Sequence, residues 1–233
     1  GRTQGGLPQF KVGGTTTSPI ITIAAPGVLI QNIGVNGAGA TGGGILLDDD
    51  GGSTKAAFGF SILGCHFKNC VGTTATDGRT GGAIQWTANG NAWQGLIAGN
   101  RFYKNVCDIL MKGTSQSIPQ DITIEDNVFS GPAASTDVNI YTAADGINGL
   151  TIRNCEFPAM PNIGSGSVKR FVDLTGSVGI MSHCTFGEIT NDTDATGTFA
   201  AAVTLAKVPA TVFITDCFGE STTTAKTAEI FRT

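Results

Sequence analysis

Charged and aromatic side chains are scarce in this chain of 233 residues, at 14% and 7% of the sequence. The 14 Lys and Arg residues are scattered and the formal net charge is only −4, so the chain lacks the basic stripe that neutralises nucleic-acid phosphates. Long apolar runs are missing as well, since none approaches the roughly 18 residues of a membrane-spanning helix. Residues 1–4 do not begin the charged-then-apolar pattern of a secretion signal. We therefore expect no nucleic-acid partner, no membrane insertion and no signal peptide in this segment.

The motifs of familiar catalytic and metal sites are also missing. The sequence has no Gly-x-Ser-x-Gly elbow and no phosphate-binding glycine loop. Its two histidines, His66 and His183, have no partner at the ligand spacing of a zinc site, so we expect no such metal site and no cofactor. Four of the six cysteines recur at one position of a repeat, which favours buried thiols over a disulfide framework.

What the chain has instead is abundant glycine, 34 residues, and a six-residue frame that returns along its length. The frame has an aliphatic residue first, Gly, Asn, Asp or His third, Cys or Asn fourth and Phe sixth. Its clear copies are residues 62–67, 97–102, 124–129, 152–157 and 181–186, with weaker copies at 30–35 and 214–219. The fourth position recurs at intervals of 27 to 35 residues, at Ile33, Cys65, Asn100, Asn127, Cys155, Cys184 and Cys217.

A second, shorter frame follows each copy of the first. It is an apolar–any–apolar triplet, typical of a short strand with one buried face. The triplets are residues 45–47, 84–86, 109–111, 138–140, 172–174 and 203–205, with a ragged copy at 230–231. Because like residues return at like positions, the strands should stack in parallel rather than pair as hairpins. The sequence predicts an all-β, single-domain parallel β-helix (solenoid) of about seven coils over residues 19–233, with residues 1–18 as an N-terminal extension or cap.

Each position of the first frame has its own physical demand. The residue types at the third position are those that best tolerate a positive φ, so it should form a sharp bend. At the fourth position, Asn100 above Asn127 should form an amide ladder, continued by the thiols of Cys155, Cys184 and Cys217. The sixth position should make a stack of phenylalanine rings inside the core.

These frames resemble those of the right-handed parallel β-helix group that includes pectate lyases, polygalacturonases and phage tailspikes. The resemblance covers roughly residues 19–231 and implies a right-handed coil. It leaves function open, because that scaffold serves both polysaccharide-degrading enzymes and inert virion shafts. The paired Asp-Asp, Gly-His-Gly and Arg-x-Lys motifs of polygalacturonases do not appear here as a set.

Three acids in the second frame are the candidate catalytic residues. Asp108 and Asp137 precede the strands of adjacent coils, and Asp173 lies in the next one. Carboxylates stacked one strand apart would lie about 5 Å from each other, close enough to hold Ca²⁺ or to act as an acid and nucleophile pair. The alternative is that they are outward-facing polar residues with no chemistry, and the absence of converging groups favours it.

Aromatic residues supply the candidate ligand contacts. Trp86 falls in the inward register of its strand and should belong to the core, whereas Trp93 and Tyr103 are the better candidates for exposed contacts. The loops after both frames are rich in Gly, Ser, Thr and Asn, where binding to a rigid scaffold usually occurs.

Two functions remain in competition. The first is a structural or adhesive module, a segment of a phage virion appendage resembling tailspikes or fibres, located in the virion or outside the cell, with polysaccharide as its ligand. It would form a homo-oligomer, with a trimer favoured, or belong to a larger parent protein, since the chain begins without Met and its last strand reaches Thr233 uncapped. The second is a small polysaccharide lyase or glycoside hydrolase; a bacterial surface adhesin shares most features of the first.

Overall fold

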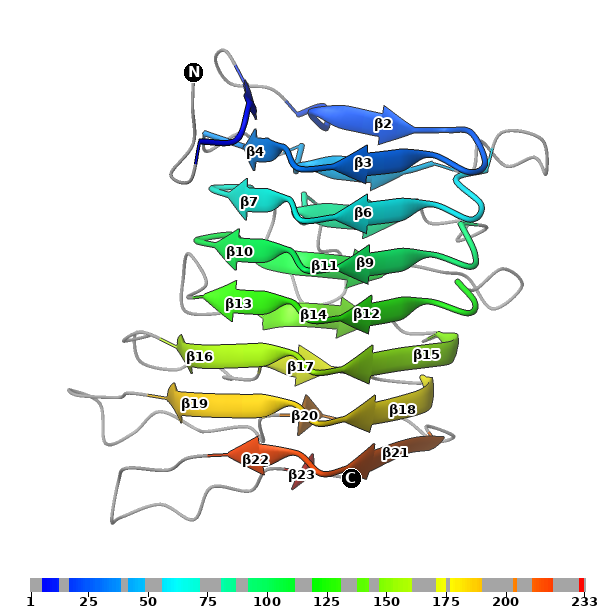
Figure 1. Cartoon of the computed structure of the whole chain (residues 1–233), viewed down its shortest axis with the longest axis vertical. Coiled ribbons are helices and arrows are strands. Elements are labelled where there is room, and N and C mark those ends of the chain that lie inside the picture. The colour runs from blue at the N-terminus through cyan, green and yellow to red at the C-terminus, as the bar shows by residue number, and fades with distance from the viewer. Residues whose placement is uncertain are drawn as a thin grey trace.

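The chain winds into a parallel β-helix in which three sheets share one core (Figure 1). The computed structural model describes residues 6–12, 17–38, 42–48, 56–71, 81–86, 92–111, 119–130, 138–142, 147–160, 171–174, 177–189, 203–204, 211–219 and 231–232. These residues contain strands, bends and loops but no helix. On the near side of Figure 1, β12 and β13 run to the left, and β14 returns behind them to the right as the chain descends, so the coil is right-handed. The predicted fold class is confirmed.

Sheet 1 holds the second half of each six-residue frame. Its eight strands are, in spatial order, β1 (Gln9–Lys11), β4 (Gly34–Asn36), β7 (His66–Lys68), β10 (Arg101–Tyr103), β13 (Val128–Ser130), β16 (Glu156–Met160), β19 (Thr185–Ile189) and β22 (Phe218–Gly219). The strand β1 comes from the segment predicted to be an extension or cap, and it pairs in parallel with β4. The first strand of sheet 1 therefore comes from residues 1–18.

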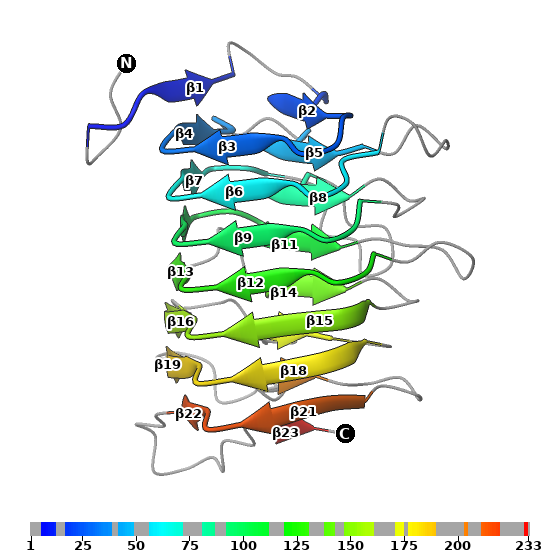
Figure 2. The same ribbon diagram turned by 45° about the vertical axis from the view of Figure 1, so that its right-hand side comes forward.

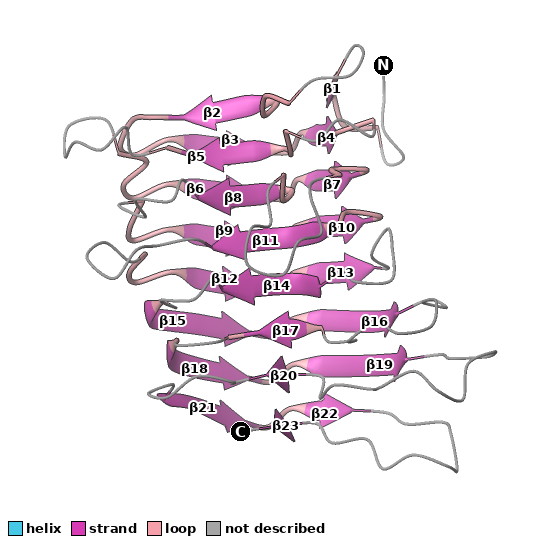
Figure 3. Ribbon diagram, turned by 180° about the vertical axis from the view of Figure 1, so that it is seen from behind, coloured by secondary structure: helices cyan, strands magenta, loops and turns pink. Residues whose placement is uncertain are grey.

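Sheet 2 is built from the apolar triplets of the second frame, and Figure 3 shows it from outside. Its eight strands are β2 (Ile21–Ile23), β5 (Ile45–Leu47), β8 (Ile84–Trp86), β11 (Cys107–Met111), β14 (Val138–Thr142), β17 (Val172–Asp173), β20 (Val203–Thr204) and β23 (Phe231–Arg232). Inward residues such as Ile84, Ile109 and Ile140 pair in register. On β8, β11 and β14 its outward side chains are buried too, including Leu110 at 0% exposure and Tyr141 at 7%.

Sheet 3 holds the first half of each six-residue frame and stands at the front of Figure 2. Its seven strands are β3 (Leu29–Gln31), β6 (Ser61–Leu63), β9 (Leu96–Ala98), β12 (Thr123–Glu125), β15 (Asn148–Arg153), β18 (Val178–Ser182) and β21 (Thr211–Thr215). Its outward face is sparsely charged. The pair formed by Glu125 and Arg153, with Nε to Oε2 at 2.6 Å, joins β12 to β15.

The bend between sheets 3 and 1 is made as the sequence predicts. All seven third-position residues have φ between 51° and 65°: Asn32, Gly64, Gly99, Asp126, Asn154, His183 and Asp216. A second column of positive φ, not predicted from the sequence, precedes sheet 3 and includes Gly27, Gly59, Gln94, Asp121 and Gly149. The described coils therefore bend at a positive-φ column at each end of sheet 3, not at one column alone.

Like side chains stack along the interior. The rings of Phe67, Phe102, Phe129, Phe157 and Phe186 form a continuous stack with centroids 4.8 to 5.0 Å apart and planes tilted by 9° to 13°. Next to it, Asn100 Nδ2 donates to Asn127 Oδ1 at 3.1 Å, which confirms the amide ladder. Each ring is almost completely buried, so the stack both removes apolar area from water and fixes the register of neighbouring coils.

No helix with the length and hydropathy required to cross a membrane occurs among the described residues.

Candidate ligand site

Asp108 is a buried structural carboxylate rather than an exposed acid. It lies on β11 with 3% of its surface exposed. Its Oδ1 accepts a hydrogen bond from Asn105 Nδ2 at 2.8 Å, and its Oδ2 accepts one from Asn139 Nδ2 at 2.7 Å. Asn105 in turn reaches the preceding coil, because its Oδ1 accepts the backbone N–H of Cys70 at 2.9 Å. The carboxylate therefore joins three coils at the corner between sheets 1 and 2.

The three candidate acids do not form a described row. Asp108 lies opposite Asn139, because Cys107 pairs with Val138 and Ile109 with Ile140. Asp173 lies opposite Tyr141, in the column two residues further along, and is also 3% exposed. Asp137 falls outside the described residues. Asp108 and Asp173 are therefore not neighbours in one column; both face outward from sheet 2, as the alternative interpretation expected, but each is buried.

This arrangement is poorly suited to acid–base or calcium chemistry. Both oxygens of Asp108 face amide N–H donors at hydrogen-bond distance, and an approaching cation would have to displace them. Within the described part of the chain, no group of three or more His, Cys, Asp or Glu side chains is placed to hold a metal ion. Asn139 Oδ1 is buried there and has no hydrogen-bond partner among the residues that the structure describes.

The three aromatic candidates differ in burial and in their contacts. Trp86 belongs to the core, as predicted: it is 2% exposed and its Nε1–H donates to Ala92 O at 3.0 Å. Trp93 is only half-buried, but its Nε1 is enclosed and finds no partner among the described residues. Tyr103 is 50% exposed on the outer face of sheet 1, and the Nζ of Lys104 lies 5.2 Å from the centre of its ring. Of the two predicted ligand contacts, Tyr103 has the open, cation-flanked setting.

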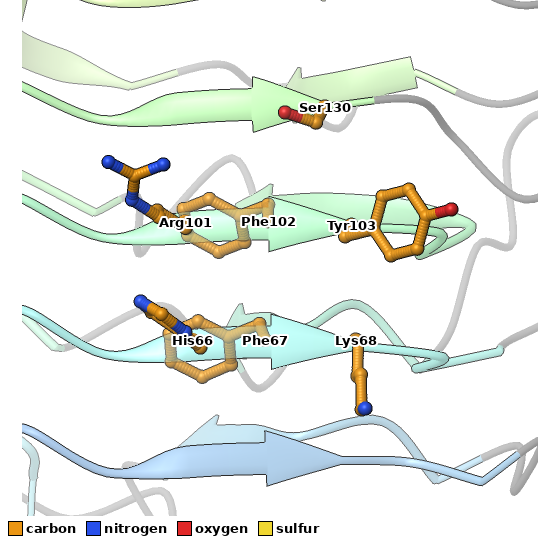
Figure 4. A pocket seen from close by; sticks show the side chains of 7 residues that line it. All are labelled: His66, Phe67, Lys68, Arg101, Phe102, Tyr103 and Ser130. Carbon is orange, nitrogen blue, oxygen red and sulfur yellow. The ribbon is translucent and has the colours of Figure 1, made fainter. Parts of the chain in front are cut away.

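Tyr103 borders a shallow depression of about 350 Å³ on sheet 1 (Figure 4). We call it the sheet 1 depression; it is lined by His66, Phe67, Lys68, Arg101, Phe102, Tyr103 and Ser130. Register explains the lining, because Arg101 lies beside His66 and Tyr103 beside Lys68 on the paired strands β10 and β7. Phe67 and Phe102 turn inward and form its floor, while the other side chains rise on either side of them.

The walls of the sheet 1 depression are cationic. Lys68 and Arg101 take part in no ion pair or side-chain hydrogen bond within the described residues. Acidic residues are absent from β1, β4, β7, β10 and β13, whereas Lys11, Lys68 and Arg101 all occupy outward positions there. The depression is thus a local positive site on a protein whose formal net charge is −4.

All six cysteines are thiols without a disulfide, and five of them are buried. Burial raises the pKa of Cys70 to about 12. The hydrogen bond with Cys155, together with burial, raises the pKa of Cys184 to about 12. The thiols of Cys70 and Cys184 are therefore protonated at neutral pH and act as small core residues, not as nucleophiles.

The sequence did not single out His66, Lys68 and Arg101 as a group. A usable signal was present, because the fifth position of the frame is outward and places His66 beside Arg101 in adjacent coils. The residue after the frame is outward again, which adds Lys68 and Tyr103. Extending the frame by one residue and collecting charges by column would have found the depression.

Comparisons with known proteins place the chain in no family. No family model, no curated protein and no solved structure matches it.

Proposed function

We propose that this chain is a non-catalytic structural and adhesive β-helix, a segment of a phage virion appendage of the tailspike or fibre type that contacts glycans on a surface. One observation carries the proposal: the sheet 1 depression combines an exposed tyrosine with cations that have no ion-pair partner among the described residues, and its strands carry no carboxylate. Glycosidases of the common type need two carboxylates, and a calcium-dependent lyase needs acidic ligands. The depression is built to hold a ligand rather than to cut one.

The repeated packing of the interior favours a rigid rod. The phenylalanine stack and the bend column repeat from coil to coil, Asn100 and Asn127 join two of the coils, and the strands of all three sheets pair with those of the next coil. Such solenoids gain stability mainly from the interfaces between repeats. A rigid rod of this kind suits an appendage that must keep its shape outside the cell.

Association into a trimer is part of this proposal. The outward face of sheet 3 carries exposed Ile180 and Phe213, at 49% and 67%, and its described charges, Glu125 and Arg153, neutralise each other. A face with apolar side chains and no net charge suits lateral contact with other copies of the chain. Light scattering at several concentrations should give a trimer mass, and replacing Phe213 with Asp should return a monomer.

The competing function is a polysaccharide lyase or hydrolase, and the decisive assay is for product. The chain is incubated with acidic polysaccharides, with and without Ca²⁺, and new reducing ends and unsaturated sugars are measured. We expect neither to rise above the level of a heat-denatured sample. Turnover that disappears in the double variant Asp108→Ala and Asp137→Ala would overturn the proposal and restore the acidic row as a catalytic site.

A further inference from the structure

We infer that the sheet 1 depression binds a saccharide that carries anionic groups, with Tyr103 against a sugar ring and Arg101 and Lys68 on charged groups at either side of it. This inference rests on the proposed adhesive function and names the ligand class of that surface. Its starting point is the coincidence of an exposed ring, two cations without ion-pair partners in the described residues, and a concave floor.

The geometry of two paired strands sets the size of the ligand. Arg101 and Tyr103 are two residues apart on β10, and their side chains leave the sheet on the same face. Two residues along a strand span about 6.6 Å, and paired strands lie about 4.8 Å apart. The gap between the column of Arg101 with His66 and the column of Tyr103 with Lys68 is therefore about the width of one pyranose ring.

Each wall offers a different contact. The ring of Tyr103 is 50% exposed and can lie against the apolar C–H face of a sugar. The guanidinium of Arg101 presents a planar fork that fits a carboxylate or sulfate with two parallel hydrogen bonds. Figure 4 shows that Arg101 extends towards β13, where Ser130 adds a hydroxyl, while Lys68 extends the opposite way. The site can therefore hold a ring at its centre and charged groups on both sides.

Electrostatics favours an anionic over a neutral sugar. No acid stands at an outward position of β1, β4, β7, β10 or β13, so nothing on these strands offsets the charges of Lys11, Lys68 and Arg101. Lys104 adds a further cation at the end of β10, beside the ring of Tyr103. On a chain with net charge −4, this face would attract an anion that the rest of the surface repels.

The test measures the affinity of three octasaccharides by isothermal titration calorimetry: one of hyaluronan, which carries carboxylates, one of sulfated dextran, and one of neutral dextran. The fourth ligand is a single-stranded oligodeoxynucleotide with the same net charge as the hyaluronan octasaccharide. We expect at least one charged saccharide to bind and the neutral one to bind at least about tenfold more weakly, since a hydrogen bond to an ionised group is roughly twice as strong as a neutral one. The two charged arms separate a carboxylate from a sulfate preference.

Substitutions in the sheet 1 depression test whether the saccharide binds there. Arg101→Ala should weaken binding of the preferred saccharide about tenfold through the lost charge-assisted hydrogen bonds. Arg101→Lys should recover only part of this loss, because a lysine cannot form the bidentate fork. Tyr103→Ala should weaken binding about threefold to tenfold, whereas Tyr103→Phe should keep most of the affinity. The matched control for the ring is Phe58→Ala, which removes an exposed ring away from the proposed contact face of sheet 3 and should leave the affinity within about twofold.

The inference would be overturned by equal affinity for neutral and charged saccharides, by unchanged affinity in Arg101→Ala, or by tighter binding of the oligonucleotide than of either charged saccharide. The last result would assign the face to nucleic-acid phosphates. Absence of any saccharide binding would also overturn it, but the mass and product assays that test the structural module would be unaffected. Conversely, cleavage of a bound saccharide would refute the non-catalytic function while leaving this site in place. Because the substituted side chains face outward, unchanged thermal midpoints verify that the variants fold.

Discussion

Replacing Asn127 with alanine probes the hydrogen-bonded corner between sheets 3 and 1. Asn127 is 0% exposed. Its Nδ2 donates to Ile97 O at 2.9 Å, and its Oδ1 accepts the backbone N–H of Asn100 at 2.9 Å. Alanine removes the partner of both backbone groups, and a buried group left unsatisfied costs about 1–3 kcal/mol. We expect the free energy of unfolding to fall by about 2–6 kcal/mol.

Cysteine at the same position should be milder, because the repeat itself uses cysteine there. Cys155 Sγ lies 3.7 Å from Ile124 O, and Cys65 Sγ lies 3.9 Å from Ile30 O. Both thiols therefore occupy the place of the Asn127 amide relative to the preceding coil. A thiol is a weak donor, so Asn127→Cys should recover part, but not all, of the stability that alanine loses.

Equilibrium unfolding in urea, monitored by far-ultraviolet circular dichroism, gives the comparison. The control is Thr123→Ala, a half-exposed outward position of β12, which should change the free energy of unfolding by less than about 0.5 kcal/mol. A loss below about 1 kcal/mol for Asn127→Ala, or a cysteine variant less stable than the alanine variant, would refute the ladder as a stabilising element.

Three further perturbations test other parts of the scaffold. Phe129→Ala removes the central ring of the stack and should cost about 3–5 kcal/mol in the same urea assay, whereas Phe129→Leu should cost clearly less; equal effects would argue against a size-dependent core. Gly99 has φ 65°, and a Cβ there would stand 3.9 Å from Gly64 N, an ordinary van der Waals contact, so Gly99→Asn should be nearly neutral and Gly99→Val should lower the thermal midpoint through about 1–2 kcal/mol of backbone strain. The pKa values of Cys70 and Cys184 are raised from 9.0 to about 12, so the protonated thiols stabilise the fold fully below pH 9 and this contribution is lost as the pH rises towards 12. Urea midpoints measured from pH 7 to 11 should therefore fall above pH 9, and Cys70→Ala should flatten that fall; a flat profile in the parent protein would contradict the burial of these thiols.

The interior columns were predictable because each is set by a local demand that returns in sequence. A residue such as Asp126 lies where the backbone needs φ 56°, and a phenylalanine such as Phe129 follows three residues later in each of the five clear copies. Only a few residue types satisfy each demand, so the frame identifies bend, ladder and stack together. Because the same residue types return at the same positions of each copy, the strands are expected to stack in parallel.

The second corner was not predictable in the same way. Gln94 adopts φ 53° and Asp121 φ 54° in a column that otherwise contains glycine, and glutamine gives no sequence signal for a positive φ. These residues are held by the ladder of backbone hydrogen bonds, for example from the N–H of Gln94 to Gln120 O at 3.0 Å. Tertiary pairing, not local preference, sets this bend.

The candidate site was predicted only in part, for a related reason. Tyr103 was identified from its type and strand position, but Lys68, which lies beside it, belongs to the adjacent coil at a separation of 35 residues. The burial of Asp108 depends on Asn105 and Asn139, which lie on different coils, and a strand pattern does not reveal that an outward face is covered. Alternation within one strand predicts side-chain direction, but not what lies over it.

A crystal structure of the chain grown with the preferred anionic octasaccharide would show directly whether this β-helix holds glycans. We expect an intact saccharide in the sheet 1 depression, with one ring against Tyr103 and an anionic group on Arg101. A saccharide bound over sheet 2 near Asp108 and Asp173, or one with a broken glycosidic bond, would contradict the claim that this β-helix holds glycans without cutting them.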